Sequence, residues 1–144
     1  MQINNKDHAG VWLDNRKAMV VIITADGNEK VIRIDSNVDE YHPKGGSGSS
    51  VPYAEHDTIS EKNYLERRKH QFKDFYTRII HELEHVDQFI VLGPGEAKIG
   101  FEKQIAERLD LRAKLDSVEA VDSYSENKIK AIVRSHFEIK FDHW

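Results

Sequence analysis

The sequence contains no cysteine. This absence excludes disulfide bonds, cysteine-ligated zinc and catalysis by a thiol, and it is typical of a protein in the reducing cytoplasm, where we expect this one to lie. No apolar run approaches the roughly 20 residues that cross a bilayer, so no membrane contact is expected. The first residues, MQINNKD, lack the apolar centre of a secretory signal.

Aromatic residues are also few, at 9% of the chain, whereas 32% of its residues are charged. Both values fit a globular protein rather than a disordered one. A chain of 144 residues is long enough for one domain with one core. We therefore expect residues 1–144 to form a single domain.

Positive charge is scarce overall, since the net charge is −4, and this value alone predicts no affinity for nucleic acid. The distribution matters more, because residues 62–78 carry six basic side chains against two acidic ones. That stretch therefore has a local charge of +4, and the rest of the chain carries −8. Such a stretch is either a surface that faces phosphates or a solvated helix face with internal ion pairs.

Apolar runs and turn residues divide the chain into strands and helices. The unbroken apolar run of residues 18–24 predicts a central strand, and Asn15 and Gly27 lie in the tight turns on either side of it. The apolar residues of the 61–86 segment recur at the helical period. The predicted strands are 10–14, 18–24, 30–35, 89–92 and 117–122, and the predicted helices are 61–86, 96–109 and 125–137.

The order β-β-β-α-β-α-β-α predicts an α/β protein. Two hairpins followed by two right-handed helical crossovers give a mixed five-stranded sheet with helices on both faces, the three-layer ribonuclease-H-like arrangement. Residues 36–60 are expected to be a flexible Gly/Ser loop. The third strand is expected at an edge of the sheet, where it could pair with a second copy, but the sequence leaves the oligomeric state open.

Each predicted helix has a face that should point into the core, and Ser125 is a candidate N-cap for the last one. The inward residues expected from the helical period are Leu65, Phe72, Tyr76, Ile79, Leu83 and Val86 on the first helix, Ile99, Ile105 and Leu109 on the second, and Ile129, Ile132 and Val133 on the third.

One segment matches the helical zinc motif H-E-x-x-H, with His81, Glu82 and His85 in the motif positions. A zinc site needs both imidazoles to line a cleft together with a third ligand. At 100° per residue, however, both histidines lie away from the apolar stripe of this helix. We therefore expect no metal here and predict no cofactor.

Three other patterns carry alternative chemistries. Asp14, Asp87 and Asp122 flank strands and could form a two-metal nuclease site, although Asp14 lies in a hairpin turn. The Gly93-Pro94-Gly95 segment opens a helix and could hold an anion, but a simple turn explains it as well. The serines at positions 47, 49 and 50 lie between His42 and His56, but nothing fixes a base beside them.

A glycine-rich loop and the basic helix that follows it form the remaining candidate site. Gly45 and Gly46 let the backbone approach a ligand closely, and Lys44 adds charge beside them. The predicted phosphate-facing residues of the helix are Arg67, Arg68, Lys69, His70 and Lys73.

These segments resemble the middle domain of the eukaryotic and archaeal class 1 peptide-chain release factors and of the rescue factor Pelota, and the chain is similar to stand-alone bacterial relatives of that domain. The resemblance covers almost the whole chain. Its segments are GVWLD at 10–14 with the run at 17–23, HPKGGS at 42–47, the basic helix around 63–70, and VLGPGEAK at 91–98, which is the most specific of them.

The resemblance implies a translation-associated module that binds the ribosome, ribosomal RNA or tRNA. Gly45 and Gly46 stand where the family has the glycines of its Gly-Gly-Gln motif, but Ser47 replaces the glutamine, so peptidyl-tRNA hydrolysis is not expected. The sequence therefore favours a binding module over an enzyme. A metal-dependent hydrolase or nuclease of ribonuclease-H-like fold is the alternative.

Overall fold

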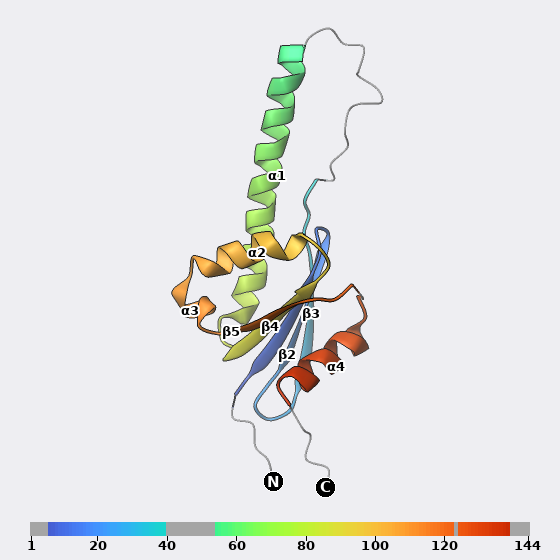
Figure 1. Cartoon of the computed structure of the whole chain (residues 1–144), viewed down its shortest axis with the longest axis vertical. Coiled ribbons are helices and arrows are strands. Elements are labelled where there is room, and N and C mark those ends of the chain that lie inside the picture. The colour runs from blue at the N-terminus through green and yellow to red at the C-terminus, as the bar shows by residue number, and fades with distance from the viewer. Residues whose placement is uncertain (1–5, 40–53, 123, 139–144) are drawn as a thin grey trace.

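Five strands form one mixed sheet in the order β3-β2-β1-β4-β5 in the computed structural model (Figure 1). The structure describes residues 6–39, 54–122 and 124–138, with the backbone alone for 54–60. The strands are β1 (His8–Leu13), β2 (Lys17–Ile23), β3 (Glu29–Asp35), β4 (Gln88–Gly93) and β5 (Leu115–Ala120). The helices are α1 (Ala54–Leu83), α2 (Ala97–Ala106), α3 (Leu109–Arg112) and α4 (Glu126–His136).

Helices cover both faces of this sheet. Alternate residues of β1 point to opposite faces, so Val11 packs toward α1, α2 and α3, while Trp12 packs toward α4. β1 pairs antiparallel with β2 and parallel with β4, and β5 adds a further parallel strand. The predicted ribonuclease-H-like arrangement is confirmed, with α3 as an additional short helix.

Two glycines allow the close approaches that hold these layers together. A Cβ atom on Gly10 would lie 2.2 Å from Cγ2 of Val133, so the absence of a side chain lets α4 pack against β1. Gly93 has φ +143°, and a Cβ there would lie 2.2 Å from the backbone oxygen of Leu13. The last residue of β4 therefore has to be glycine.

The long helix α1 extends well beyond the sheet (Figure 1). Its 30 residues make a rod about 45 Å long. Among its described side chains, those of residues 61–83, the buried ones are Phe75, Ile79, Ile80 and Leu83. No described side chain from residue 61 to residue 74 is buried, and this part of the helix projects past the sheet.

This projection explains two differences from the sequence prediction. The helix begins at Ala54, inside the segment expected to be a loop, because a projecting turn has no apolar period to reveal it. The prediction that Leu65 faces the core is wrong, since Leu65 is 47% exposed. It continues the apolar stripe of Phe72 and Tyr76 beyond the point where the sheet ends.

The second predicted helix also differs, because it breaks into α2 and α3. The prediction that Ile99 and Leu109 point inward is wrong, since they are 47% and 76% exposed. The inward positions are taken by Phe101 and Ile105 on α2 and by Leu111 on α3. Ile99 lies two residues, or about 200°, from Phe101 and so on the opposite side of α2. The break at Glu107 shifts the phase of the apolar residues and leaves Leu109 outside.

The last helix and the edge strand are as predicted. The hydroxyl of Ser125 accepts a hydrogen bond from the backbone N–H of Lys128 and so caps α4, whose buried residues are Ile129 and Val133. β3 lies at one edge of the sheet. Within the described ranges, no helix combines the length and the apolar character needed to cross a membrane.

Candidate nucleic-acid interface

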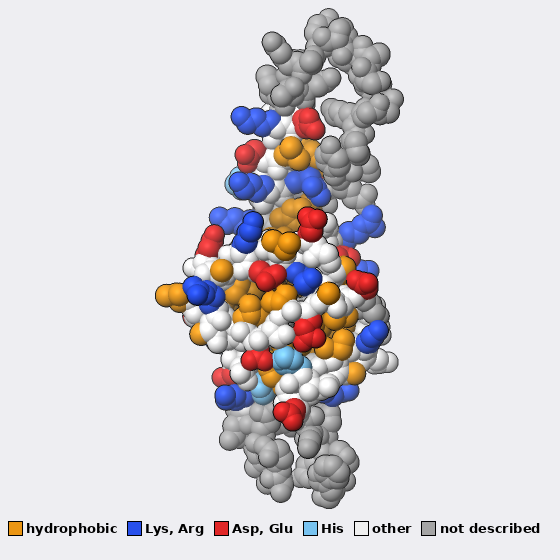
Figure 2. Space-filling view, in the orientation of Figure 1, with side chains coloured by type: hydrophobic (Ala, Val, Ile, Leu, Met, Phe, Trp, Pro, Cys, Tyr) orange, Lys and Arg blue, Asp and Glu red, His pale blue; other side chains and the backbone are white. Residues whose placement is uncertain are grey.

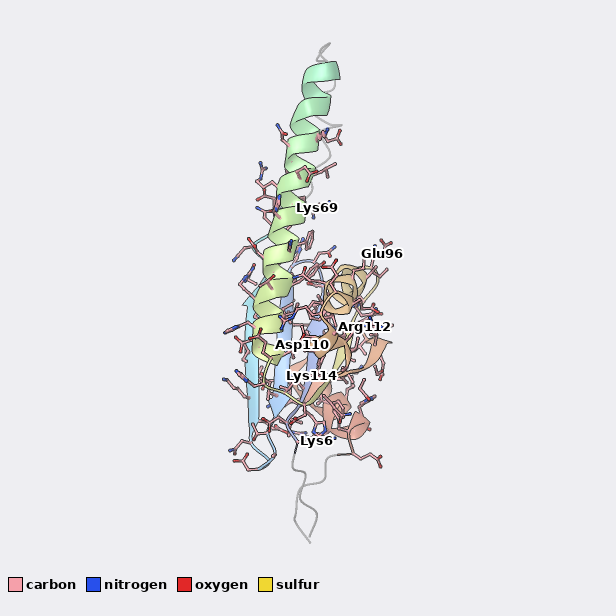
Figure 3. All side chains as sticks on the ribbon, turned by 90° about the vertical axis from the view of Figure 1, so that its left-hand side faces the viewer. Lys6, Lys69, Glu96, Asp110, Arg112 and Lys114 are labelled. Atoms are coloured by element: carbon pink, nitrogen blue, oxygen red, sulfur yellow. The ribbon has the colours of Figure 1, made fainter. Side chains whose placement is uncertain are left out.

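The basic residues predicted to face phosphates lie on the part of α1 that leaves the body. We call residues 61–73 the outer segment of α1. None of its side chains is fully buried. In Figure 2, lysine and arginine side chains alternate with acidic ones along this projection. In Figure 3, Lys69 lies nearer to the projecting end of α1 than Glu96, the residue just before α2.

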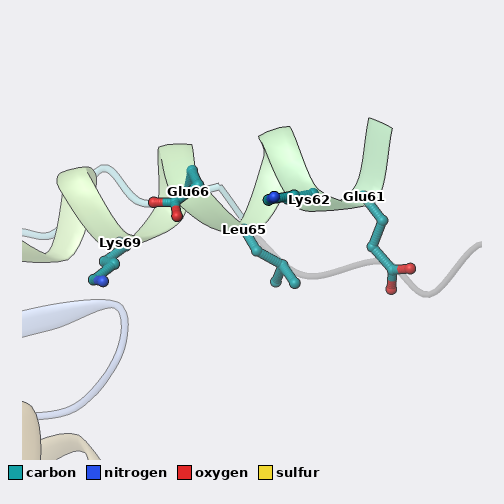
Figure 4. Close-up of a pocket in the computed structure, with 5 residues that line it drawn as sticks. All are labelled: Glu61, Lys62, Leu65, Glu66 and Lys69. Carbon is teal, nitrogen blue, oxygen red and sulfur yellow. The ribbon is translucent and has the colours of Figure 1, made fainter. Parts of the chain in front are cut away.

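Three lysines share one side of the outer segment. At 100° per residue, Lys62, Lys69 and Lys73 fall within an arc of about 40°. All three are exposed, and none forms an ion pair with a described residue. Lys62 and Lys69 line an open hollow of about 360 Å³ together with Leu65, Glu61 and Glu66 (Figure 4). This lysine face can accept an anion without first breaking an ion pair to the described part of the chain.

The two arginines lie on another side of the helix and contact Asp39, which follows β3. Nε of Arg67 lies 2.8 Å from Oδ2 of Asp39, and Nε of Arg68 donates to the backbone oxygen of Asp39 at 2.8 Å. The Oε1 atom of Gln71 accepts the backbone N–H of Asp39 at 3.0 Å. Three residues of α1 therefore hold one residue of the segment that leaves the sheet.

This attachment continues farther down α1. The guanidinium of Arg78 donates to the backbone oxygens of Asp35 and Ser36, at 2.7 and 3.0 Å. Asp35 is the last residue of the edge strand β3, and Ser36 follows it. Part of the positive charge of α1 thus fixes the chain that follows β3, a role that the sequence did not indicate.

An aromatic ring lies close to the guanidinium of each of these two arginines, Arg67 and Arg68. The guanidinium carbon of Arg67 lies 5.4 Å from the ring centre of Tyr64, and that of Arg68 lies 5.2 Å from the ring centre of Phe72. Both distances are within the range of cation–π attraction. The hydrogen bond from Arg67 also holds the pKa of the Asp39 carboxyl below its usual value, so Asp39 is ionised at neutral pH.

The remaining predicted residues are placed as follows. His70 is exposed on the outer segment. The loop residues Lys44, Gly45, Gly46 and Ser47 lie outside the described residues, as do the serines at 49 and 50 and His42, and the side chain of His56 is not described. The predicted roles of these residues stay predictions. Lys62 and Asp39 are the additions that the structure makes to the candidate site.

The zinc-motif residues do not assemble into a site. α1 ends at Leu83, so His85 lies beyond the helix that the H-E-x-x-H geometry requires. His81 has a 78% exposed side chain, and its Nδ1 lies 3.6 Å from Oε1 of Glu84. Among the residues that the structure describes, no three histidine or carboxylate side chains could hold a metal ion.

The three aspartates of the alternative nuclease site are also apart. Oδ1 of Asp14 accepts the backbone N–H groups of Arg16 and Lys17, at 2.8 and 2.9 Å, and so shapes a turn. Asp87 precedes β4, whereas Asp14 follows β1, and these strands are parallel. They therefore lie at opposite ends of the sheet, and Asp122, which follows β5, cannot join both.

A lysine side chain, that of Lys98, donates hydrogen bonds to two carbonyls of the Gly93-Pro94-Gly95 turn. Lys98 is only 9% exposed, and its Nζ donates to the backbone oxygens of Gly93 at 2.9 Å and Gly95 at 3.3 Å. The Gly93 oxygen also accepts the backbone N–H of Val121 at 3.3 Å, so Lys98 adds a second donor there and links it to the Gly95 carbonyl across the turn. The segment is thus explained as a turn between β4 and α2, which is one of the two alternatives that the sequence left open.

Comparison with known proteins gives a likeness in fold only. No family model and no curated protein match the sequence. The Pelota protein of Thermoplasma acidophilum has 16% identity and a TM-score of 0.52, over 95% of this chain and 33% of that one. The archaeal translation termination factor aRF1 has 15% identity and a TM-score of 0.55, over 95% and 36%. The Pelota of Archaeoglobus fulgidus has 16% and 0.52, over 92% and 32%.

The chain has a release-factor-like fold. This confirms the resemblance of the sequence to that family at the level of architecture. The release-factor-like chain spans about a third of the length of each of these structures. The activities and partners of the longer proteins are therefore not carried over by the match itself.

Proposed function

We propose that this chain is a translation-associated module that binds RNA, on the ribosome or as tRNA, through the outer segment of α1. The proposal is supported by the fold, which matches part of a translation termination factor, aRF1, and of Pelota. A place in the cytoplasm follows from it. Hydrolysis of peptidyl-tRNA is not proposed, because Ser47 stands where the release factors carry their glutamine.

The observation that carries the proposal is the lysine face. Lys62, Lys69 and Lys73 project from the body without ion pairs to described residues, on a net acidic chain. Glu61 and Glu66 line the same hollow, but none of the three lysines forms an ion pair with a described carboxylate, so their ammonium groups can attract an anionic partner. A phosphate backbone supplies such a partner and needs no particular base sequence.

Sedimentation with ribosomes over a range of KCl concentrations tests the proposal. The wild-type protein should pellet with ribosomes at low salt and be released as salt rises, because each phosphate that a lysine neutralises releases counterions. The variant Lys69→Glu/Lys73→Glu should bind less tightly at every salt concentration. Its log–log salt slope should be smaller by about 0.7 to 0.9 for each phosphate that these two side chains no longer neutralise.

A matched control is Lys30→Glu/Lys128→Glu, which makes the same change of charge on exposed lysines of β3 and α4. If binding depends on the lysine face, this variant should lose much less affinity. Equal losses in both variants would indicate a general charge effect. Absence of wild-type binding to ribosomes and to RNA at every salt concentration would reject the proposed function.

A further inference from the structure

Asp39 contacts α1 through its side chain and its backbone independently. Its carboxylate accepts the Nε hydrogen of Arg67 at 2.8 Å. Its backbone is held separately, by Arg68 on the carbonyl oxygen and by Gln71 on the N–H. The position of the main chain at residue 39 therefore does not depend on the carboxylate, and the ion pair is a separate feature.

Arg67 uses little of its hydrogen-bonding capacity in this contact. A guanidinium has five N–H donors, and among the described residues Arg67 makes only the bond from Nε. Its side chain is 56% exposed, and its guanidinium lies over the ring of Tyr64. The ring and the Nε bond both restrict the guanidinium, while the two terminal nitrogens form no hydrogen bond with any described residue.

The ion pair itself contributes little to folding. Both side chains are exposed, at 56% and 42%, and exposed pairs are weakened by water and salt. A carboxylate and a phosphate present similar oxygens to a guanidinium, and both form charge-assisted hydrogen bonds with it. The Asp39 carboxylate therefore binds Nε of Arg67 with the kind of oxygen that a phosphate also offers, and this ion pair adds little to the stability of the fold.

We propose that a phosphodiester group of RNA binds the terminal nitrogens of Arg67, while the Asp39 carboxylate stays on Nε as a resident anion that opposes this binding and so sets the affinity of the arginine for its ligand. This inference rests on the proposed RNA-binding function and adds a site and a competitor to it. The site consists of the terminal nitrogens of Arg67, with the ring of Tyr64 beneath the guanidinium. The lysine face supplies non-specific attraction, and the Asp39 carboxylate opposes binding at Arg67.

The variant Asp39→Asn tests the proposal by a gain of affinity. The amide oxygen still accepts the Nε hydrogen bond, and Arg68 and Gln71 still hold the backbone, but the negative charge is gone. One charge removed a few ångströms from a bound phosphate should tighten binding about two- to fivefold at low salt. A gain of this kind cannot result from partial unfolding.

The probe is a labelled single-stranded RNA oligonucleotide, with binding followed by fluorescence anisotropy as KCl is varied. The gain should shrink as salt rises, because the added attraction is screened. Glu107→Gln is the control, since it removes the same charge from an exposed residue at the end of α2 that forms no ion pair with a described residue. Its affinity should stay close to that of the wild type.

A double variant shows whether the effect acts through Arg67. In an Arg67→Gln background, Asp39→Asn should give no more than the small gain of the control. If Asp39→Asn binds as weakly as the wild type, or more weakly, while the wild type binds RNA, the competitor role is wrong and the proposed function stands. If the wild type binds neither RNA nor ribosomes, both proposals are wrong.

Discussion

The close approach of Gly10 to Val133 allows a sharp test of how α4 packs on the sheet. In Gly10→Ala the new methyl group would lie 2.2 Å from Cγ2 of Val133, far inside van der Waals contact. Valine in a helix has one strongly preferred rotamer, so the methyl group cannot simply rotate away. α4 must shift, and overpacking of this kind costs about 1–3 kcal/mol of unfolding free energy.

The matched variant Val133→Ala removes the clashing atom. The nearest remaining atoms to the new Cβ would be Cγ1 of Ile90 at 3.5 Å and Cβ of residue 133 at 3.6 Å, both at ordinary van der Waals separation. Val133→Ala alone should cost about 2 kcal/mol, from reduced burial and a small cavity. Gly10→Ala should then add little or nothing to that cost, because its methyl group fills part of the space.

Urea denaturation followed by circular dichroism, on the wild type, both single variants and the double variant, measures the coupling. We expect the double variant to be more stable than the sum of the single changes by about 1–3 kcal/mol. Strictly additive costs would show that Gly10 and Val133 do not meet in the folded protein. The packing of α4 described above would then be incorrect.

Three further predictions concern single sites. Gly93→Ala should cost about 3 kcal/mol or more in urea denaturation, because the clash is with the backbone oxygen of Leu13 and the positive φ is strained for alanine; a loss below about 1 kcal/mol would contradict this. Lys98→Met should cost about 1–3 kcal/mol, since it removes both hydrogen bonds to the carbonyls of Gly93 and Gly95, and an unchanged midpoint would show that they need no donor. Burial lowers the pKa of His8 below 6.5, so the unfolded chain binds the proton of this imidazole more tightly than the folded protein does. The free energy of unfolding should therefore fall as the pH drops below 6.5. The variant His8→Gln should lose this part of the pH dependence. An equal slope in both proteins would refute the assignment to His8.

The sheet could be predicted from the sequence because each strand carries its own signal. The run of residues 18–24 is apolar on both faces, and β2 lies inside the sheet between β3 and β1. Alternation at residues 30–35 placed β3 at an edge, where it lies. Ser125 gave the start of α4, since its hydroxyl is suited to cap a helix.

The beginning of α1 could not be predicted from hydrophobic periodicity. That signal reports which residues meet a core, and the backbone of the first turns of α1 lies beyond the sheet (Figure 1). For the same reason the period predicts that Leu65 faces the core, because its phase on the helix matches that of Phe72, whereas Leu65 is exposed. The period gives the direction in which a side chain points, but not whether the body extends far enough to cover it.

The candidate site was only partly visible in the sequence. The charge count of residues 62–78 pointed to the helix, but it treated Arg67 and Lys69 alike. The structure separates them, because Arg67 pairs with Asp39 and Lys69 pairs with no described carboxylate. Arg67 and Asp39 lie 28 positions apart in the chain, and no local pattern indicates an interaction of that range.

The length of α1 beyond the sheet has a consequence for its dynamics. Helical segments with few tertiary contacts are only marginally stable in water, and the described hydrogen bonds from the outer segment to the sheet side of the molecule all go to Asp39, from Arg67, Arg68 and Gln71. Amide hydrogen–deuterium exchange should therefore be fast near Glu61 and slow progressively toward Phe75, where burial begins. A ligand bound to the outer segment of α1 would slow amide exchange along the whole exposed stretch, including amides that it does not contact.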